Sequence, residues 1–344
     1  MRIGVVGGGA PGGDWQRAVN TARLADELGY DSFWLGETWG YELFSSLAHL
    51  AHVTERITLG AGIANVFSRS ATVIAMSAAT VDAQSGGRLI LGLGSSGPVV
   101  IEKLHGVPFE RPLQRLREYT GIINTLIAGE QLDHHGELLQ LDQGFRLRMN
   151  PVRPHIPIYI ASLTPKSLEQ SGEIADGVLP IYWPGAKFGE MRTLLDGAST
   201  SANRPHGSTR IAPYITTAVV EKDDDREAMR RRARAPVAFY IGRMGNFYAE
   251  MLERHGFVDE VAAVRKGWKD GHDAAAAGVS DAMLDATALV GTADEIATKL
   301  ESWVTAGLDE PLLSFAGADP AKVERSLRAL AEMNSESVLA QDAR

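Results

Sequence analysis

The chain contains no cysteine among its 344 residues. A disulfide framework, a thiolate nucleophile and a cysteine-ligated metal site are therefore excluded. No apolar run is long enough to cross a bilayer, and the start "MRIGVV" lacks the basic-then-apolar layout of a secretory signal. Basic residues are outnumbered, with 34 Lys and Arg against 43 Asp and Glu, so no nucleic-acid surface is expected. We therefore expect a cytoplasmic protein without membrane or nucleic-acid partners.

The residues that are present describe an ordinary globular composition. Hydrophobic residues make up 44% and charged residues 22% of the chain, which allows a large core. The length fits either two modest domains or one large α/β barrel. Only the last residues, 336–344, are expected to form a flexible tail.

Strand and helix patterns alternate from one end of the chain to the other. Short apolar runs such as residues 2–6, 57–63 and 88–94 are typical of buried strands, and helical patterns separate them. Asp14 is expected to cap the first helix, and Asp319 with Pro320 to begin the last. About eight such units predict an α/β protein of the (β/α)8 TIM-barrel class. We expect one domain over residues 1–335, with a hairpin insertion at about 130–150. A helical insertion is expected at about 223–307, between strands 7 and 8.

The opening "MRIGVVGGGAPGGDWQ" spells G-x-G-x-x-G at Gly7, Gly9 and Gly12, the pattern of a dinucleotide-binding turn. In that fold a helix should already be running where "PGG" stands, and proline and glycine disfavour a helix interior. The helix instead begins at Asp14, whose carboxylate would lie where the pyrophosphate belongs. The acidic Glu37 also lies past the usual spacing. We interpret the glycines as a flexible loop after the first barrel strand. A NAD(P)-dependent dehydrogenase is an alternative that rests on these glycines alone.

Several segments in order resemble the luciferase-like monooxygenase superfamily, in its F420-dependent branch. They are "ELGYDSFWLGE", "ERITLGAGIANVFSRSATVIAMSAATVDAQSGGRLILGLGSSGP", "PVRPHIPIYIAS", "EIADGVLP" and "LVGTADEIATKLESWVTAGLDEPLLSF". The resemblance covers nearly the whole chain. It implies a (β/α)8 barrel of the bacterial-luciferase type that binds coenzyme F420, or alternatively FMN, at the carboxyl ends of its strands.

The glycine-rich strand ends are the first candidate cofactor segments. "GAGIAN" has room for a ligand ring or a bulge, and the resemblance implies a non-proline cis peptide near Gly62-Ile63. The small residues of "GLGSSGP" suit a flavin edge, although both segments also fit a small-residue barrel layer or a common loop. By the resemblance, the cofactor-binding residues are Gly62, Ile63, Ala64, Asn65, Gly94, Ser95, Ser96, Ala161, Ser162, Leu163, Thr164, Tyr182 and Lys187.

The turn "ASLTPKS" leads from a strand into a helix. Helix amides and the positive end of the helix dipole attract anions, and barrels commonly bind phosphate at such a terminus. The resemblance implies that Ser162 and Thr164 lie at the cofactor phosphate. The alternative is an ordinary capped helix.

Glu37, Thr38 and Trp39 at the end of the second strand are the candidate catalytic residues. The resembled F420 enzymes often place an acidic residue and then a histidine here, facing the deazaflavin. This chain keeps the acid but has Thr38 in place of the histidine, which removes the usual proton donor. Trp39 could line the substrate pocket or be an exposed loop aromatic.

The nine histidines do not form a metal site. His134 and His135 are adjacent on the expected hairpin and point to opposite faces, while His49 and His52 share a helix face without a carboxylate partner. The run at Arg230–Arg232 with Arg234 is interpreted as a solvated helix face, or alternatively as a contact for an anionic cofactor tail.

Three functions follow. The first is an F420-dependent oxidoreductase that transfers a hydride between coenzyme F420 and an organic substrate. The second is an FMN-dependent monooxygenase served by a separate reductase. The third, suggested by Thr38, is a non-catalytic deazaflavin-binding protein. The partner is a small-molecule substrate that the sequence does not identify, and the resemblance implies a homodimer.

Overall fold

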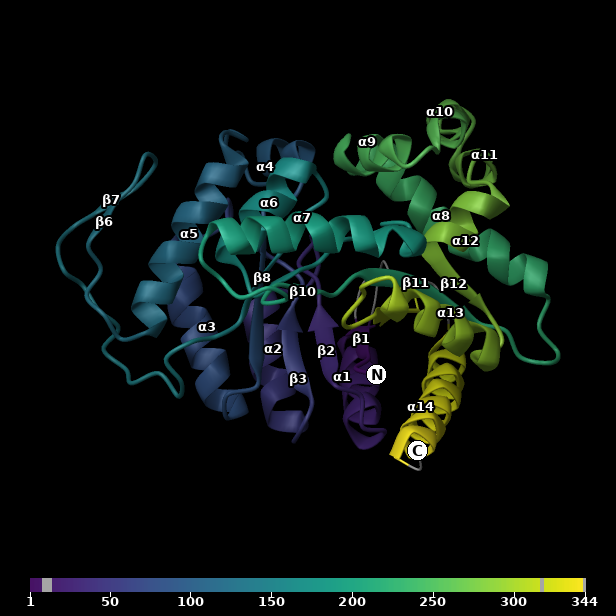
Figure 1. The fold of residues 1–344 in the computed structure, drawn as a ribbon, viewed down its shortest axis with the longest axis horizontal. Coiled ribbons are helices and arrows are strands. Elements are labelled where there is room, and N and C mark those ends of the chain that lie inside the picture. Colours follow the sequence, from purple (N-terminus) through teal and green to yellow (C-terminus); the bar gives the residue numbers. More distant parts are fainter. Residues whose placement is uncertain (8–13, 316–318, 343–344) are drawn as a thin grey trace. The chain divides into compact units, whose positions relative to one another are not determined.

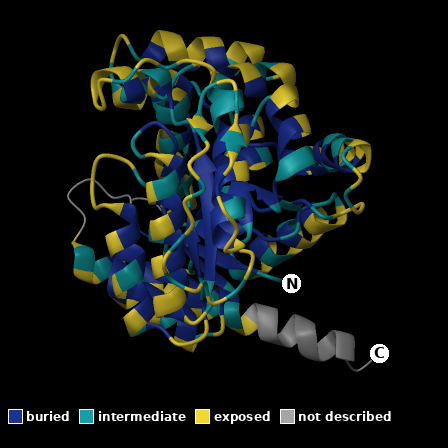
Figure 2. Ribbon diagram, turned by 90° about the vertical axis from the view of Figure 1, so that its left-hand side faces the viewer, coloured by how far each residue is buried: buried dark blue, intermediate teal, exposed yellow. Residues whose placement is uncertain are grey.

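The computed structural model of the chain describes residues 1–7, 14–315 and 319–342. It divides into two compact units, whose elements are shown in Figure 1. The terminal unit consists of Met1–Asp31, Pro180–Thr193 and Arg210–Arg344. The central unit consists of Ser32–Leu179 and Leu194–Thr209. Figure 2 shows the strands buried and the helices with exposed residues along their outer sides.

The central unit is built on parallel strands in the order β9-β8-β5-β3-β2, with β4 paired to β5. These strands are β2 (Ser32–Leu35), β3 (Thr58–Ala61), β4 (Ala64–Asn65), β5 (Leu89–Gly94), β8 (Ile158–Ile160) and β9 (Gly177–Val178). The helices are α2 (Leu43–Val53), α3 (Ala71–Ser85), α4 (Pro98–Lys103), α5 (Pro112–Ile127) and α6 (Pro165–Ile174). Helices α2, α3, α5 and α6 pack in this order, each against the next. The helix α7 (Phe188–Ser201) contains the division between Thr193 and Leu194.

Small residues let large side chains fill the central sheet. All six residues of β5, "LILGLG", are buried. A Cβ at Gly60 of β3 would lie 2.1 Å from the indole of Trp34 in β2, so only glycine leaves room for that ring. The indole N–H of Trp34 donates to the Ser32 hydroxyl over 2.7 Å, which satisfies the one polar atom of the buried ring.

The hairpin expected near residues 130–150 is present as the antiparallel strands β6 (His134–His135) and β7 (Gln140–Leu141). Its turn is held by Glu118 of α5, whose side chain is 3% exposed. The Glu118 carboxylate accepts hydrogen bonds from the backbone N–H groups of Glu137, Leu138 and Leu139 at 2.9, 3.0 and 2.9 Å. It also contacts Nε2 of His134 at 3.3 Å. One buried carboxylate therefore fixes the turn to the helix.

We expect Glu118→Gln to lower the free energy of unfolding by about 3 kcal/mol at neutral pH. Burial raises the pKa of Glu118, but hydrogen bonds, led by that from Gln114, outweigh it and bring the pKa to about 2. Because the folded pKa lies below the unfolded value, this stability is present above about pH 4.5 and is lost as the pH falls toward 2. Urea unfolding of the wild type and the variant at neutral and acidic pH measures it.

The matched control is Glu137→Gln in the same turn, where the glutamate side chain is 65% exposed. It should change the stability by less than about 1 kcal/mol. A loss for Glu118→Gln no larger than that of the control, or one that does not diminish in acid, would contradict the role of Glu118.

The terminal unit contains four parallel strands in the order β1-β13-β11-β12. They are β1 (Gly4–Gly7), β11 (Tyr214–Val219), β12 (Ala288–Gly291) and β13 (Leu312–Ser314), and β10 (Arg210–Ile211) precedes β11. The helices are α1 (Trp15–Glu27), η1 (Gly185–Lys187), α8 (Arg226–Arg243), α9 (Phe247–Arg254), α10 (Val258–Gly267), α11 (His272–Ala277), α12 (Asp281–Thr287), α13 (Ala293–Thr305) and α14 (Pro320–Asp342).

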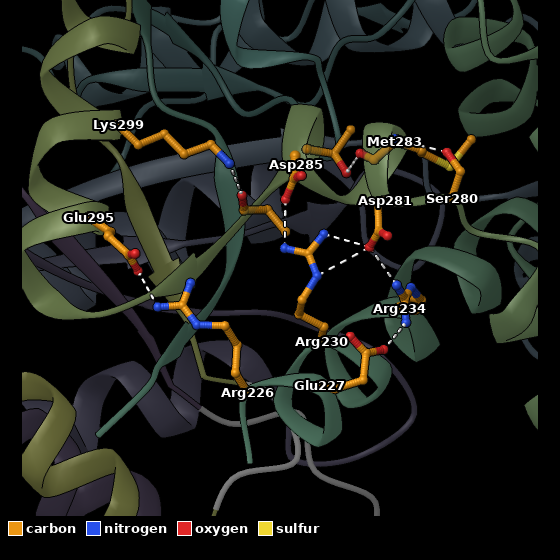
Figure 3. Close-up of polar contacts among 12 residues, drawn as sticks. Arg226, Glu227, Arg230, Arg234, Ser280, Asp281, Met283, Asp285, Glu295 and Lys299 are labelled. Atoms are coloured by element: carbon orange, nitrogen blue, oxygen red, sulfur yellow. Dashed lines mark hydrogen bonds and ion pairs between the residues drawn. The ribbon is translucent and has the colours of Figure 1, made fainter. Parts of the chain in front are cut away.

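An ion-pair network joins α8 to α12, as Figure 3 shows. The guanidinium of Arg230 contacts Asp281 at 2.6 Å and Asp285 at 2.8 Å, and Arg234 contacts Asp281 at 2.6 Å. The side chains of Arg230 and Arg234 are 15% and 13% exposed. The interpretation of the arginine run as a solvated face is therefore wrong for these two residues, because carboxylates distant in the sequence cover them. The two arginines between them are exposed.

The helix caps expected from the sequence are confirmed. The Asp14 carboxylate accepts from the N–H of Gln16 at 2.9 Å, and Asp319 accepts from that of Lys322 at 3.0 Å. The glycines at positions 8–13, including Gly9 and Gly12 of the opening motif, lie outside the described residues. The sequence patterns did not predict α4, α7 or, within the expected helical insertion, β12. The strand β12 has only four residues, "ALVG", and α7 contains Gly and Ser residues that disfavour helices.

Candidate active site

Four strands of the central unit end at one edge of its sheet, since β8, β5, β3 and β2 are parallel neighbours. Ligands in such sheets bind outside the carboxyl ends of the strands. The predicted residues 37–39 follow β2, 62–65 follow β3, 94–96 end β5 and 161–164 follow β8. The structure therefore brings together the four predicted segments of the central unit, which we name the carboxyl edge.

Gly94 lies at the centre of the carboxyl edge. A Cβ at this position would lie 2.8 Å from Cγ1 and Cδ1 of Ile63 and 3.3 Å from Cβ of Ala161. The bond between Gly62 and Ile63 is a cis peptide, as the resemblance implied. Ala64 and Asn65 form β4, which pairs with the end of β5. The ends of β3, β5 and β8 thus form a close-packed surface of small and aliphatic side chains.

Glu37 is held by Arg69, which was not predicted as a site residue from the sequence. The Arg69 guanidinium binds the Glu37 carboxylate in a bidentate pair, with N–O distances of 2.7 and 2.5 Å. Their side chains are 16% and 14% exposed. Arg69 also reaches the carboxylate of Glu42, the N-cap of α2, at 2.5 Å. The hydrogen bonds that Arg69 donates to the Glu37 carboxylate raise the pKa of Arg69 above its ordinary value. Glu37 is therefore fixed in one orientation.

Aromatic groups hold Arg69 from two sides. Its guanidinium lies 5.4 Å from the ring centroid of Phe44, and its backbone carbonyl accepts the Tyr119 hydroxyl at 3.0 Å. Burial raises the pKa of Glu42, but hydrogen bonds, led by those from Ser45, outweigh it and bring the pKa below its ordinary value. A sequence signal for Arg69 does exist, because it is the one charged residue between positions 57 and 81. A lone charge in an apolar stretch needs a partner.

The other predicted polar and aromatic residues of the carboxyl edge range from exposed to fully buried. Thr38 is exposed, and Trp39 is 61% exposed. A catalytic role for Thr38 and a place for Trp39 in the substrate pocket stay predictions. Asn65 is 4% exposed, and its Oδ1 accepts from the N–H of Phe67 at 2.9 Å, so its amide folds the loop. Ser96 has a left-handed backbone with φ of 56°, and the Ser95 hydroxyl contacts its carbonyl at 3.3 Å.

The turn before α6 has a complete capping box. Oγ1 of Thr164 accepts from the N–H of Ser167 at 3.2 Å, and the Ser167 hydroxyl accepts from the N–H groups of Leu163 and Thr164 at 3.2 and 3.0 Å. The Ser162 hydroxyl lies 2.7 Å from that of Ser171 and is buried. These hydroxyls cap and anchor the helix, and a phosphate contact at this turn stays a prediction.

Tyr182 and Lys187 belong to the terminal unit, whereas the other predicted site residues belong to the central unit. Tyr182 is 4% exposed, with a left-handed φ of 58°. Nζ of Lys187 pairs with Glu190 at 2.6 Å. A cofactor role for either residue stays a prediction.

Two further features lie outside the predicted site. A hollow of about 510 Å³, open solvent included, lies between β11, α8 and α14, and none of the predicted site residues lines it. Residues at its wall include Met229 and Arg232 of α8 and Lys322 of α14. Within the described part of the chain, no group of three or more acidic or histidine side chains could hold a metal ion. No described helix is both long and apolar enough to span a membrane.

Comparison with known proteins gives matches over nearly the whole chain. Residues 2–310 match the sequence model of the luciferase-like monooxygenases. A Mycobacterium tuberculosis protein provisionally named a coenzyme F420-dependent oxidoreductase is 32% identical over 88% of this chain and 92% of its own length. A 5,10-methylenetetrahydromethanopterin reductase of Archaeoglobus fulgidus is 31% identical over 84% of this chain and 86% of its own.

A solved structure extends the likeness to the fold. The coenzyme F420-dependent tetrahydromethanopterin reductase from Methanopyrus kandleri superposes with a TM-score of 0.83 at 22% identity, covering 96% of this chain and 98% of that one. The predicted fold class, α/β of the (β/α)8 type, is confirmed. The resemblance stated from the sequence and the expected class of enzyme, a deazaflavin- or flavin-dependent oxidoreductase, are confirmed as well.

Proposed function

The chain belongs to the luciferase-like monooxygenase family, and from this premise we propose that it transfers a hydride between coenzyme F420 and an organic substrate. The names of its relatives from Mycobacterium tuberculosis and Archaeoglobus fulgidus support the reaction class and, for the first, the cofactor. The expected homodimer and cytoplasmic location remain part of this proposal.

The observation that carries the proposal is the surface at Gly94. A flat ring system needs an apolar wall without protruding side chains. Because Gly94 has no Cβ, the side chains of Ile63 and Ala161 pack closely against its backbone, and together the three residues offer such a wall at the carboxyl edge. The deazaflavin ring would lie against this wall. The backbone amides of Ser95 and Ser96 directly follow Gly94 in the chain, at the end of β5.

The polar residues of the carboxyl edge orient the ligands. Bound F420 supplies the hydride chemistry, and the protein supplies binding, orientation and electrostatics. A carboxylate has about four lone-pair sites, and Arg69 occupies one on each oxygen of Glu37. Glu37 can therefore accept a further hydrogen bond from a hydroxyl or ring N–H while Arg69 keeps it in place. Thr38 is exposed beside it and offers a hydroxyl where the resembled enzymes often have histidine.

We expect the purified protein to bind F420 at least about tenfold more tightly than FMN, a difference of about 1.4 kcal/mol. Equilibrium titrations followed by the absorption and fluorescence of each cofactor measure both constants. Tight binding of FMN with no binding of F420, together with oxygen uptake driven by reduced FMN, would instead establish the monooxygenase. Binding of F420 without turnover of any acceptor would favour the non-catalytic protein.

A further inference from the structure

Arg115 of α5 is a half-buried cation without a counter-ion. The other half-buried arginines of the central unit are Arg69, Arg88, Arg153 and Arg204. The first and third pair with carboxylates at 2.5 and 2.7 Å, and the other two donate to backbone carbonyls at 2.7 and 2.8 Å. Arg115 does neither with any of the described residues. A cation held partly out of water is unfavourable unless an anion compensates it.

The guanidinium of Arg115 leaves most of its donors unused. Nη1 donates to the Tyr119 hydroxyl at 3.4 Å, which is long for a charged donor. The Nε–H is enclosed and has no acceptor in the described part of the chain. Nη2 makes no hydrogen bond to the described residues either, but it is not enclosed, so a ligand can reach it. Nε and Nη2 belong to the planar fork with which arginine recognises carboxylates and phosphates.

Aromatic rings hold this guanidinium in place. Its Cζ lies 4.6 Å from the ring centroid of Phe67 and 5.8 Å from that of Tyr119. The Phe67 ring is itself stacked on that of Phe109, with centroids 5.2 Å apart and planes at 26°. Such contacts stabilise an arginine but do not neutralise its charge or accept its N–H groups. The guanidinium is therefore oriented while its charge stays uncompensated.

Arg115 adjoins the carboxyl edge within the central unit. Phe67 comes two residues after β4, and its N–H donates to the side chain of Asn65 at 2.9 Å. The Tyr119 hydroxyl, which Arg115 contacts, donates to the backbone carbonyl of Arg69 at 3.0 Å. Both connections place the guanidinium beside the segments that follow β3 and β4.

The chemistry of the fork selects the ligand. Charge-assisted hydrogen bonds from arginine are strongest to carboxylate and phosphate oxygens, whereas a neutral acceptor leaves the charge uncompensated. Glu118, three residues along α5, does not supply the anion, because its oxygens accept the backbone N–H groups of the hairpin turn. The anion must therefore come from a ligand.

Resting on the proposed function above, we propose that Arg115 binds a carboxylate or phosphate group of the ligand at the carboxyl edge. The ring system lies at Gly94, and the anionic group extends to Nη2 of Arg115. This group belongs either to the tail of the cofactor or to the substrate, and the two arms of the experiment distinguish these sources.

The first arm compares F420 with its ribityl-deazaflavin core, which has the same ring but no phosphate or carboxylate. Arg115→Met keeps an unbranched stem beside Phe67 and removes the guanidinium. If the tail is the ligand, the variant should bind F420 about tenfold more weakly and the core as the wild type does. Arg117→Met, two residues along the same helix at an exposed pair, is the control and should change neither affinity. Fluorescence titrations measure both ligands.

The second arm titrates inorganic phosphate and benzoate into the wild type and both variants by calorimetry, with saturating F420. If a substrate group is the ligand, F420 binding is unchanged in Arg115→Met. The wild type should then bind one of the two anions about tenfold more tightly than that variant. Without F420 binding, the same titrations are carried out on the protein alone.

Thermal unfolding of each variant accompanies both arms. Arg115→Met should not lower the unfolding midpoint below that of the control, because no ion pair is lost. A folded Arg115→Met protein that matches the wild type in both arms would overturn the inference. So would an equal loss of affinity for F420 and its core, which would show that Arg115 supports the ring site instead of an anion.

If Arg115→Met does not fold, Arg115→Lys replaces it, since lysine keeps the charge but not the fork. A loss of at least about twofold for F420 or for one of the small anions, with the core unaffected, would support the inference. Unchanged affinities would overturn it. If an anion binds through Arg115 but F420 does not bind at all, the proposed function fails while the anion site stands.

Discussion

Replacing Gly94 by valine is expected to abolish F420 binding, with a loss of at least about 100-fold in affinity, or about 2.7 kcal/mol. The first carbon of the new side chain would already lie 2.8 Å from Ile63 and 3.3 Å from Ala161. The isopropyl group must therefore displace Ile63 or protrude over the carboxyl edge. Either result removes the flat wall against which the deazaflavin ring is proposed to lie. Titration of the variant with F420 measures the effect.

The control for this variant is Gly121→Val, at an exposed glycine of α5 where a Cβ would meet no atom within 4 Å. It should bind F420 like the wild type. Circular dichroism and thermal unfolding of both variants separate a local effect from misfolding. A folded Gly94→Val protein with wild-type affinity for F420 would exclude the carboxyl edge as the ring site.

Arg69→Met is expected to lower the free energy of unfolding by about 2 to 3 kcal/mol and to weaken F420 binding about tenfold. Methionine fills much of the volume of arginine but cannot pair with a carboxylate. Glu37, with only 14% of its side chain exposed, would be left without its bidentate partner. An unpaired charge at this depth is unfavourable, and its carboxylate would lose its fixed orientation. Urea unfolding and F420 titration measure the two effects.

A second substitution separates charge from packing. Glu37→Gln added to Arg69→Met removes the uncompensated charge and should restore part of the lost stability. Arg117→Met is the surface control, because Arg117 and its partner Glu173 are 42% and 37% exposed. It should cost less than about 1 kcal/mol. If Arg69→Met costs no more than the control, the pair does not organise the site.

Local sequence patterns correctly predicted those elements whose structure depends only on neighbouring residues. The Asp14 and Asp319 caps and the apolar strand "LILGLG" depend on neighbours in the sequence, and all three were predicted. The short strand β12 was missed because four residues carry little periodic signal, and its pairing with β11 is a long-range contact. The opening glycines match a dinucleotide-binding motif, but the proline and glycines that follow, the position of Asp14 and the alternation of strands and helices along the chain all argued against that fold.

Side-chain partners were the part of the site that the sequence did not predict. The segments at the carboxyl edge follow from strand order and from the family resemblance, so Gly94 and Ile63 were identified. The pairing of Glu37 with Arg69 depends on two loops 32 positions apart meeting in space. The hydroxyl of Thr164 was expected at a phosphate, yet its hydrogen bonds to Ser167 depend only on the local helix cap. A polar residue in a turn can either cap the adjacent helix or bind a ligand, and the sequence alone does not distinguish these two roles.

A structure of the protein with F420 bound would show where the deazaflavin ring lies. We expect the ring to lie against Ile63, Gly94 and Ala161, with the Glu37–Arg69 pair intact beside it. A ring bound elsewhere on the chain, for example over the opening glycines, would contradict it.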